Sequence, residues 1–158
     1  MDALFEEFFS LMDSVGKRLT QLTELAKKKY DAVMHDDLMA LNEIMNQEQA
    51  ESLAFRSLES KREKLLKQLG IQNTSLAALP QLCPPDQRTR AAECAASVQK
   101  QYKEYRQAAD MARNALERGV REIDQVLRAS GADPAVGAPG YAEQDAVLPP
   151  NMKTDFHA

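Results

Sequence analysis

The chain has 158 residues, of which 44% are hydrophobic and 28% are charged, so it is long enough for one modest domain. Its formal charge of −4 gives no average attraction to phosphate backbones or anionic membranes, and nucleic acid is not expected as a partner. No run approaches the ~18 apolar residues of a membrane span, and the first residues carry acids where a secretory signal carries bases. We therefore expect a cytoplasmic protein without stable membrane insertion.

The first predicted helix covers about residues 2–34, where apolar residues recur every three or four positions and line one face. Asp2 can cap its start, and the lysines at 27–29 carry the sign that the helix dipole favours near a C-terminus. This position gives the three lysines a purely structural explanation. The stripe consists of Leu4, Phe8, Leu11, Val15, Leu19, Leu22, Ala26, Tyr30 and Val33.

The second predicted helix covers about residues 37–69 and forms a tight antiparallel hairpin with the first. Either Asp36 or Asp37 can cap its start, and Gly70 is placed to end it. Its stripe consists of Leu38, Leu41, Met45, Glu48, Ser52, Phe55, Leu58, Arg62, Leu65 and Leu69.

Two charged residues, Glu48 and Arg62, lie on this apolar stripe, where a polar group often fixes the register of packed helices. They are too far apart in one helix to pair with each other, so each either snorkels from the edge of the stripe or pairs across helices. Asn114 is a similar polar neighbour of the third helix's stripe. The other charges at 59–67 alternate in sign and are interpreted as a solvated surface.

Residues 70–85 contain Gly, Asn and three Pro, so they are expected to form a connection with at most one turn at 75–79. A third helix is predicted at about 86–129, capped by Asp86. From residue 131 the chain is rich in Pro and Gly and is expected to be a flexible tail to residue 158. The third stripe consists of Ala91, Cys94, Val98, Tyr102, Tyr105, Ala109, Ala112, Leu116, Val120, Ile123 and Leu127.

These elements predict an all-α fold: a long antiparallel hairpin plus a third long helix, in a coiled-coil-like three-helix bundle over residues 1–130. If the third helix returns antiparallel along the second, it is too long for its partners, at roughly 66 Å against roughly 50 Å. The predicted overhang carries an apolar face that must meet solvent, a second copy, the tail or another protein. Its residues are Gly119, Val120, Ile123, Val126 and Leu127. For residues 91–116 a core role and a binding role both stay open.

The sequence offers no catalytic or metal site and implies no cofactor. It lacks a Gly-rich phosphate loop, a nucleophile elbow and an HExxH motif, so we expect that it is not an enzyme. His35 has aspartates around it, but a turn histidine beside capping acids explains them better than a metal ion does. Cys83 and Cys94 form no CxxC pattern and are expected to be reduced thiols.

A family resemblance gives these features a function. The chain resembles FlgN, the flagellar export chaperone family, over roughly residues 15–130. The residues that carry the resemblance are Asp37-Leu38, Leu41, Glu48-Gln49, Arg56, Glu59, Arg62, Leu65-Leu66, Leu69-Gly70, Asn114 and Leu116.

The resemblance implies a cytoplasmic chaperone of flagellar type III export. Such a chaperone binds the C-terminal helical segments of the hook-filament junction proteins FlgK and FlgL, prevents their premature assembly and delivers them for export. Contacts with the export apparatus itself are left open. In that family the C-terminal amphipathic helix binds the client, which corresponds here to Tyr105, Ala109, Ala112, Leu116, Val120, Ile123, Val126 and Leu127.

Two other hypotheses compete with an export chaperone. In the first, the third helix pairs with its own copy in a structural coiled coil, a homodimer without a client. In the second, the chain is a docking adaptor for a membrane-associated ATPase.

Overall fold

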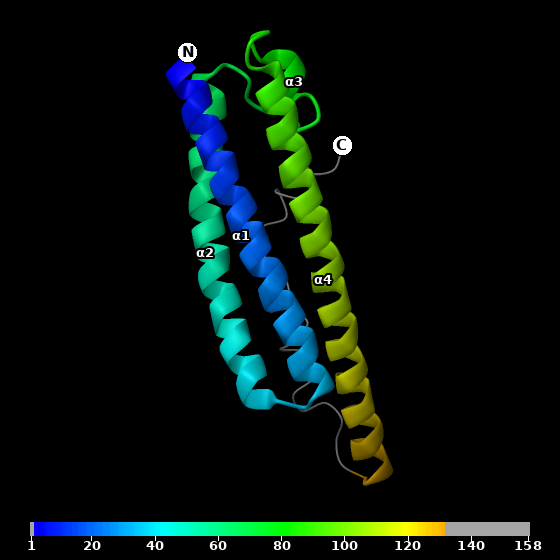
Figure 1. Ribbon diagram of the computed structural model, residues 1–158. Coiled ribbons are helices and arrows are strands. Elements are labelled where there is room, and N and C mark those ends of the chain that lie inside the picture. The colour runs from blue at the N-terminus through cyan, green and yellow to red at the C-terminus, as the bar shows by residue number, and fades with distance from the viewer. Residues whose placement is uncertain (1, 132–158) are drawn as a thin grey trace.

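The computed structural model describes residues 2–131, and within that range the chain forms four helices and no strand. α1 spans Asp2–Met34, α2 spans Leu38–Gln68, α3 is a single turn at Leu79–Leu82, and α4 spans Arg88–Ala129. The three long helices lie side by side, as Figure 1 shows. The all-α fold is therefore confirmed, while the predicted tail at 131–158 lies, except for its first residue, outside the described residues.

The central element is α1, because α2 and α4 both pack along it and have few backbone contacts with each other. α2 runs antiparallel to α1, whereas α4 runs parallel to it (Figure 1). α4 thus runs antiparallel to α2, as the length argument assumed, but it packs mainly along α1 and not along α2. α1 also buries more than one stripe, because it has a neighbour on two sides. Its buried residues outside the predicted stripe include Phe5, Phe9, Met12 and Leu25.

The hairpin between α1 and α2 has the predicted boundaries. Asp36 adopts a left-handed backbone conformation with φ 52°, and the carboxylate of Asp37 accepts a hydrogen bond of 3.0 Å from the N–H of Ala40. At the other end of α2, Gly70 has φ 74° and the N–H of Ile71 donates to the carbonyl of Leu66 at 3.0 Å. The bond from Ile71 satisfies one of the last carbonyl groups of α2, as in a Schellman motif.

The connection from α2 to α4 closes the upper end of the bundle, where Leu76, Leu79 and Cys83 are buried. The prediction that Asp86 caps α4 is wrong. The N-cap position is Gln87, which makes no side-chain capping bond. The chain makes one more turn before the helix, closed by the N–H of Gln87 donating to the carbonyl of Pro84 at 2.9 Å, and this turn contains Asp86.

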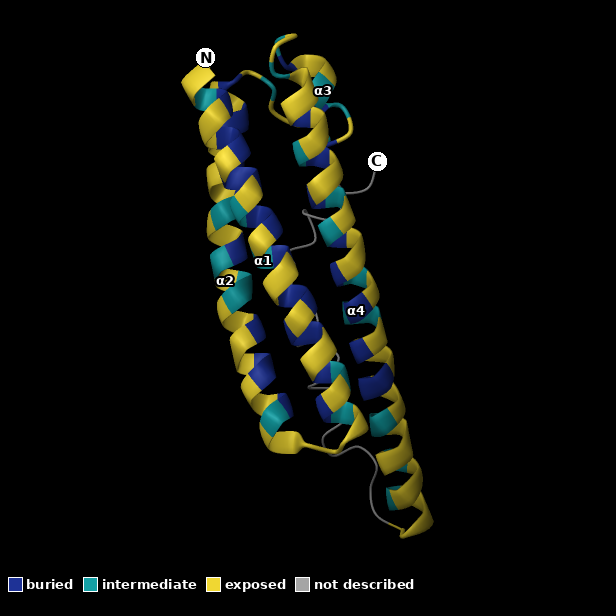
Figure 2. Ribbon diagram, in the orientation of Figure 1, coloured by how far each residue is buried: buried dark blue, intermediate teal, exposed yellow. Residues whose placement is uncertain are grey.

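The core consists of two clusters that follow each other along the bundle. The larger cluster fills the upper part and contains the aromatic residues, whereas the smaller one lies near the α1–α2 turn (Figure 2). The larger cluster is built around Phe5, Phe8, Phe9, Met12, Val15, Leu19, Leu22, Phe55, Val98, Tyr102 and Tyr105. The smaller cluster is Leu25, Ala32, Leu41, Ile44, Met45 and Leu116.

Specific contacts fix the register of α4 on α1. Arg90 forms an ion pair with Glu6, 84 residues away, and its guanidinium lies 4.9 Å from the centre of the Phe9 ring. Further down, Gly16 faces Gln101, whose amide group fills the place where a Cβ would stand. The two contacts have offsets of 84 and 85 residues, so they put Met34, the last residue of α1, level with Arg118 and Gly119. The rest of α4 continues beyond this level.

This register makes a prediction about Gly16, because a Cβ there would lie 2.3 Å from Oε1 of Gln101. Gly16→Ala alone should fail to give the roughly 1 kcal/mol that alanine normally adds to a helix interior. In a Gln101→Ala background the same substitution should stabilise the fold by about that amount. Urea unfolding of the four variants measures this coupling, and an equal effect of Gly16→Ala in both backgrounds would contradict the close contact.

Candidate functional site

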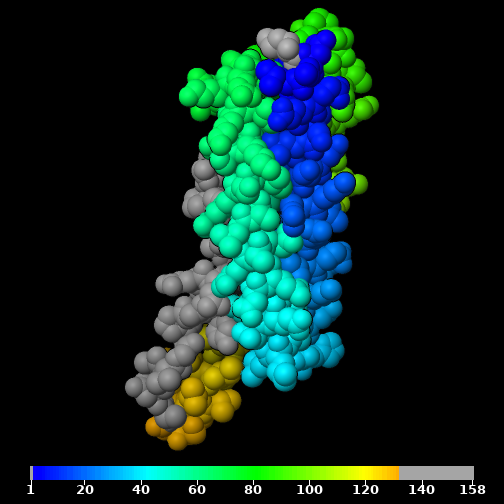
Figure 3. Space-filling model, turned by 90° about the vertical axis from the view of Figure 1, so that its left-hand side faces the viewer, coloured from blue at the N-terminus to red at the C-terminus, as the bar shows by residue number. Residues whose placement is uncertain are grey.

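The free end of α4, residues 119–129, has no helix beside it among the described residues. It projects past the α1–α2 turn, as Figures 1 and 3 show. Burial changes at the same level: Leu116 is 8% exposed, whereas Ile123 is 60% and Val126 is 67% exposed. Val120 and Leu127 are half-buried. The overhang that helix length predicts is therefore present, although α4 extends beyond α1 and not only beyond α2.

The eight predicted client-binding residues fall into two groups. In the first, Tyr105, Ala112 and Leu116 are buried and Ala109 is half-buried, and all four lie in the part of α4 that packs along α1. A partner can reach the three buried residues only after α4 separates from α1. For 91–116 the structure thus favours the core role in the free chain. The second group is Val120, Ile123, Val126 and Leu127, which the free end already exposes to different degrees.

The polar residues of the free end balance one another. Arg121 and Arg128 are matched by Glu122 and Asp124. Such a surface has little net field to attract a charged partner over a distance. Its main means of binding is therefore the apolar stripe.

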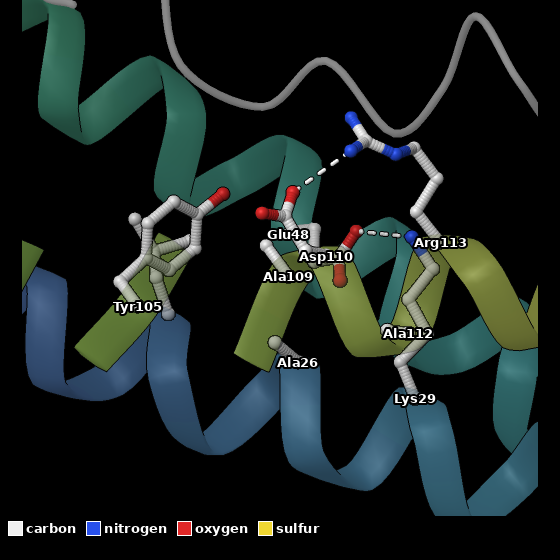
Figure 4. A pocket seen from close by; sticks show the side chains of 9 residues that line it. Ala26, Lys29, Glu48, Tyr105, Ala109, Asp110, Ala112 and Arg113 are labelled. Atoms are coloured by element: carbon white, nitrogen blue, oxygen red, sulfur yellow. Dashed lines mark hydrogen bonds and ion pairs between the residues drawn. The ribbon is translucent and has the colours of Figure 1, made fainter. Parts of the chain in front are cut away.

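Above the free end, the predicted polar residue Glu48 forms a buried ion pair with Lys29 of α1 (Figure 4). The Lys29 Nζ and the Glu48 Oε2 are 3.2 Å apart, and the two side chains are 3% and 7% exposed. The hypothesis of a cross-helix pair is confirmed for Glu48. The interpretation of Lys29 as part of a dipole-stabilising run is wrong, because that argument considered only its own helix and not the carboxylate on α2.

This ion pair borders a cavity of about 30 Å³ between the three long helices, next to Asp110 and Arg113 of α4. Arg113 pairs with Asp110 at 2.8 Å, at a more exposed position than the Lys29 pair (Figure 4). The space is far smaller than the ~300 Å³ at which small-molecule pockets begin. This position therefore stabilises packing and holds no ligand of metabolite size.

The other two predicted polar residues differ from Glu48. Arg62 forms a buried ion pair within its own helix, with its Nε 2.9 Å from Oε2 of Glu59. The interpretation of Glu59 as a surface residue is therefore wrong, because it lies on the inner side of α2 with Arg62. Asn114 is exposed, and its role in fixing register stays a prediction.

A family model described as FlgN protein matches residues 1–140. The chain belongs to the FlgN family. Membership supports a general role as a flagellar export chaperone, in a family that binds flagellar proteins. The match is longer than the stretch over which individual residues resemble the family, and it includes α1, which positions α4. No curated protein and no solved structure matches the chain.

Residues 2–131 also bear on binding to membranes and metal ions. None of the helices there is long and apolar enough to cross a lipid bilayer. The same range holds no group of three or more His, Cys, Asp or Glu side chains placed to bind a metal ion. His35 lies in the hairpin turn with its Nδ1 2.7 Å from the carbonyl oxygen of Asp31, and His157 lies outside the described residues.

Both cysteines are free, as the sequence predicts. Burial raises the pKa of the Cys94 thiol to about 11, and burial also raises the pKa of the Cys83 thiol. Since the thiolate is the reactive form, a raised pKa keeps both groups protonated and unreactive near neutral pH.

The raised pKa makes a prediction about alkylation of Cys94. Relative to an unperturbed thiol with a pKa of 9.0, Cys94 should have about 100-fold less thiolate at pH 8. Its alkylation rate should therefore rise about tenfold per pH unit up to nearly pH 11. Peptide-resolved mass spectrometry separates Cys94 from Cys83, with the urea-unfolded chain as control. A plateau above pH 9 in the folded chain would contradict the shift.

The buried ion pair makes a second prediction. Lys29→Met should cost about 3–5 kcal/mol of folding stability, because it removes the lysine partner of a buried carboxylate. The double variant Lys29→Met/Glu48→Leu should lose much less, since apolar residues of similar size often replace a buried pair at little cost. Lys27→Met is the matched control, because Lys27 pairs with Glu24 at an exposed position and should cost at most about 1 kcal/mol. Equal losses for Lys27→Met and Lys29→Met in urea unfolding would contradict the role of the buried pair.

Proposed function

We propose that this protein is a cytoplasmic chaperone that binds the C-terminal helical segments of the flagellar junction proteins FlgK and FlgL through α4. By covering those segments it prevents premature assembly, and it delivers them for export. Family membership supports the general role. The observation that carries the choice of surface is the apolar stripe of α4, which continues past the level where α1 ends.

The size of the free end limits how tightly it alone can bind. Full burial of Val120, Ile123, Val126 and Leu127 would contribute at most about 6–12 kcal/mol gross, because Val120 and Leu127 are already half-buried. Association costs about 4–15 kcal/mol in lost freedom. The free end by itself therefore supports weak binding, and a stable complex needs further contacts.

The upper part of α4 can supply such contacts if it exchanges partners. Where α4 packs on α1 below Tyr105, it does so largely through Ala108, Ala112 and Ala115, which bury little area each. A client helix that first binds the free end could extend upward by replacing part of α1, with Leu116 as the next apolar anchor. In this way residues that are core in the free chain become client contacts.

The proposal predicts the effect of charges on the stripe. Val120→Asp/Ile123→Asp should abolish binding of a helical C-terminal peptide of FlgK or FlgL, because two carboxylates would replace the apolar anchors. Helicity and melting temperature should change little, since neither side chain belongs to a core cluster. Fluorescence anisotropy measures binding, and circular dichroism measures stability.

Two controls make this test specific. Met111→Asp adds a charge at an exposed position of the same helix and should leave binding unchanged, whereas Leu116→Asp should destabilise the fold. Light scattering of the wild-type protein with and without peptide tests the rival hypothesis of a self-associating coiled coil. A stable dimer that does not bind the peptide would overturn the proposed function.

A further inference from the structure

Apolar side chains are also exposed at the end of the α1–α2 hairpin, next to the level where the free end of α4 begins. Met34 is 55% exposed and Leu38 is 71% exposed, although the stripes of their helices are buried further up. Neither residue has a role in the contacts described above. Their positions relative to α4 decide whether they form one surface with it.

Met34 lies on the side of α1 that faces α4. It follows Gly16 by 18 residues, about five full helical turns, and Gly119 follows Gln101 by the same number. Since Gly16 touches Gln101 and the two helices run parallel, Met34 and Gly119 face each other. Within residues 2–131, no atom outside the helix's own backbone lies within 4 Å of the place where a Cβ of Gly119 would stand, so these residues leave open space at this point.

Leu38 lies on the core-facing line of α2. It precedes Met45 by seven residues, two turns of the helix, and Met45 packs in the smaller cluster with Leu41 and Leu116. The core-facing sides of all three long helices thus extend beyond the core at the same end of the bundle. There Met34 and Leu38 form an apolar floor, and the stripe of the free end forms a wall that rises from it.

We propose that Met34 and Leu38 are a second part of the client-binding site, an inference that rests on the proposed function. The occupant is an amphipathic client helix that lies along the free end, in line with α1, with one end on the floor. The free end is about 16 Å long, which corresponds to about three turns of such a helix. A helix fits this place because α4 has one continuous stripe. Its upper part is covered by α1, which is itself a helix packed parallel to α4, and its lower part is the stripe of the free end.

The charges beside the stripe argue for a client over a second copy. Glu117 and Asp124 are seven residues apart, and each directly follows a stripe residue, so they border the same edge. If two copies paired antiparallel, matching Leu116 with Leu127, these edges would meet and place Glu117 beside Asp124. Like charges at such flanking positions disfavour pairing. A client with neutral or basic residues on that edge avoids this repulsion.

The test compares two double variants that remove the same kinds of side chain at matched exposure. Met34→Gln/Leu38→Gln removes the floor. Met111→Gln/Leu53→Gln is the control, since Met111 is 55% and Leu53 is 66% exposed, away from the hairpin end. The floor variant should weaken binding of a helical C-terminal FlgK or FlgL peptide to the full chain at least tenfold, and the control variant should not change it.

Methionine methyl groups give a second readout that does not depend on mutation. In a sample labelled with ¹³C-methyl methionine, the peptide should shift the Met34 signal and leave the Met111 and buried Met12 signals in place. The Met34→Gln variant assigns the signal. Light scattering of the wild type and the floor variant reports any change in oligomeric state.

The outcomes separate this inference from the proposed function. If the peptide binds and Val120→Asp/Ile123→Asp abolishes binding, but the floor variant binds normally and Met34 does not shift, the floor is overturned and the proposed function stands. A wild type that does not bind the peptide overturns both. A dimer that the floor variant converts to monomer would make a second copy the occupant and overturn the choice of a client. The peptide could also shift the Met34 signal only in a chain truncated before residue 132. That result would identify residues 132–158 as the occupant in the full chain and would likewise overturn the choice of a client.

Discussion

The packing of α4 along α1 in one register determines most of what this molecule presents to a partner. Arg90 holds the upper end through Glu6 and the Phe9 ring, and Gln101 occupies the space that only a glycine at position 16 leaves. A slide of one turn would bring Met12 or Thr20 against Gln101, where a larger side chain leaves no such space. Because α4 starts level with the first turns of α1 and has 42 residues against 33, its surplus must project at the other end.

The two ends of the bundle are held together unequally. The upper cluster contains buried aromatic rings, whereas the lower cluster contains one alanine and five aliphatic or methionine side chains. Between them the Lys29 and Glu48 pair joins α1 to α2. Leu116, directly above the free end, is the one residue that α4 contributes to the smaller cluster. Regions with few buried apolar contacts open at lower free energy than the rest of a fold, so the place where a client would extend its contacts is also the easiest to open.

The sequence predicted the helices well because spacing and capping are local. The stripe positions, Asp37 as a cap and Gly70 as a terminator all depend on residues within one or two turns, and helix length alone predicts an overhang. The partner of each helix could not be predicted in this way. A stripe does not show which neighbour covers it, so the parallel packing of α4 on α1 and the second buried side of α1 were missed. Lys29 and Glu59 were misinterpreted because a charge pattern does not show which charges are buried. Lys29 is buried with Glu48 of α2, and Glu59 lies with Arg62 on the inner side of its own helix.

The candidate site was partly predictable because it depends on α4 being longer than the helices that pack beside it. Val120, Ile123 and Leu127 follow from length and spacing, whereas Met34 and Leu38 needed the register, which places the end of α1 opposite Gly119. That geometry also bears on selectivity. The balanced charges of the free end give little long-range attraction, so a client must be selected by shape and apolar contact. A helix that starts on the hairpin end finds about three turns of α4 to cover. A longer client helix has to project into solvent or displace α1 from the alanine seam, and the cost of that displacement would set how far up α4 a client binds.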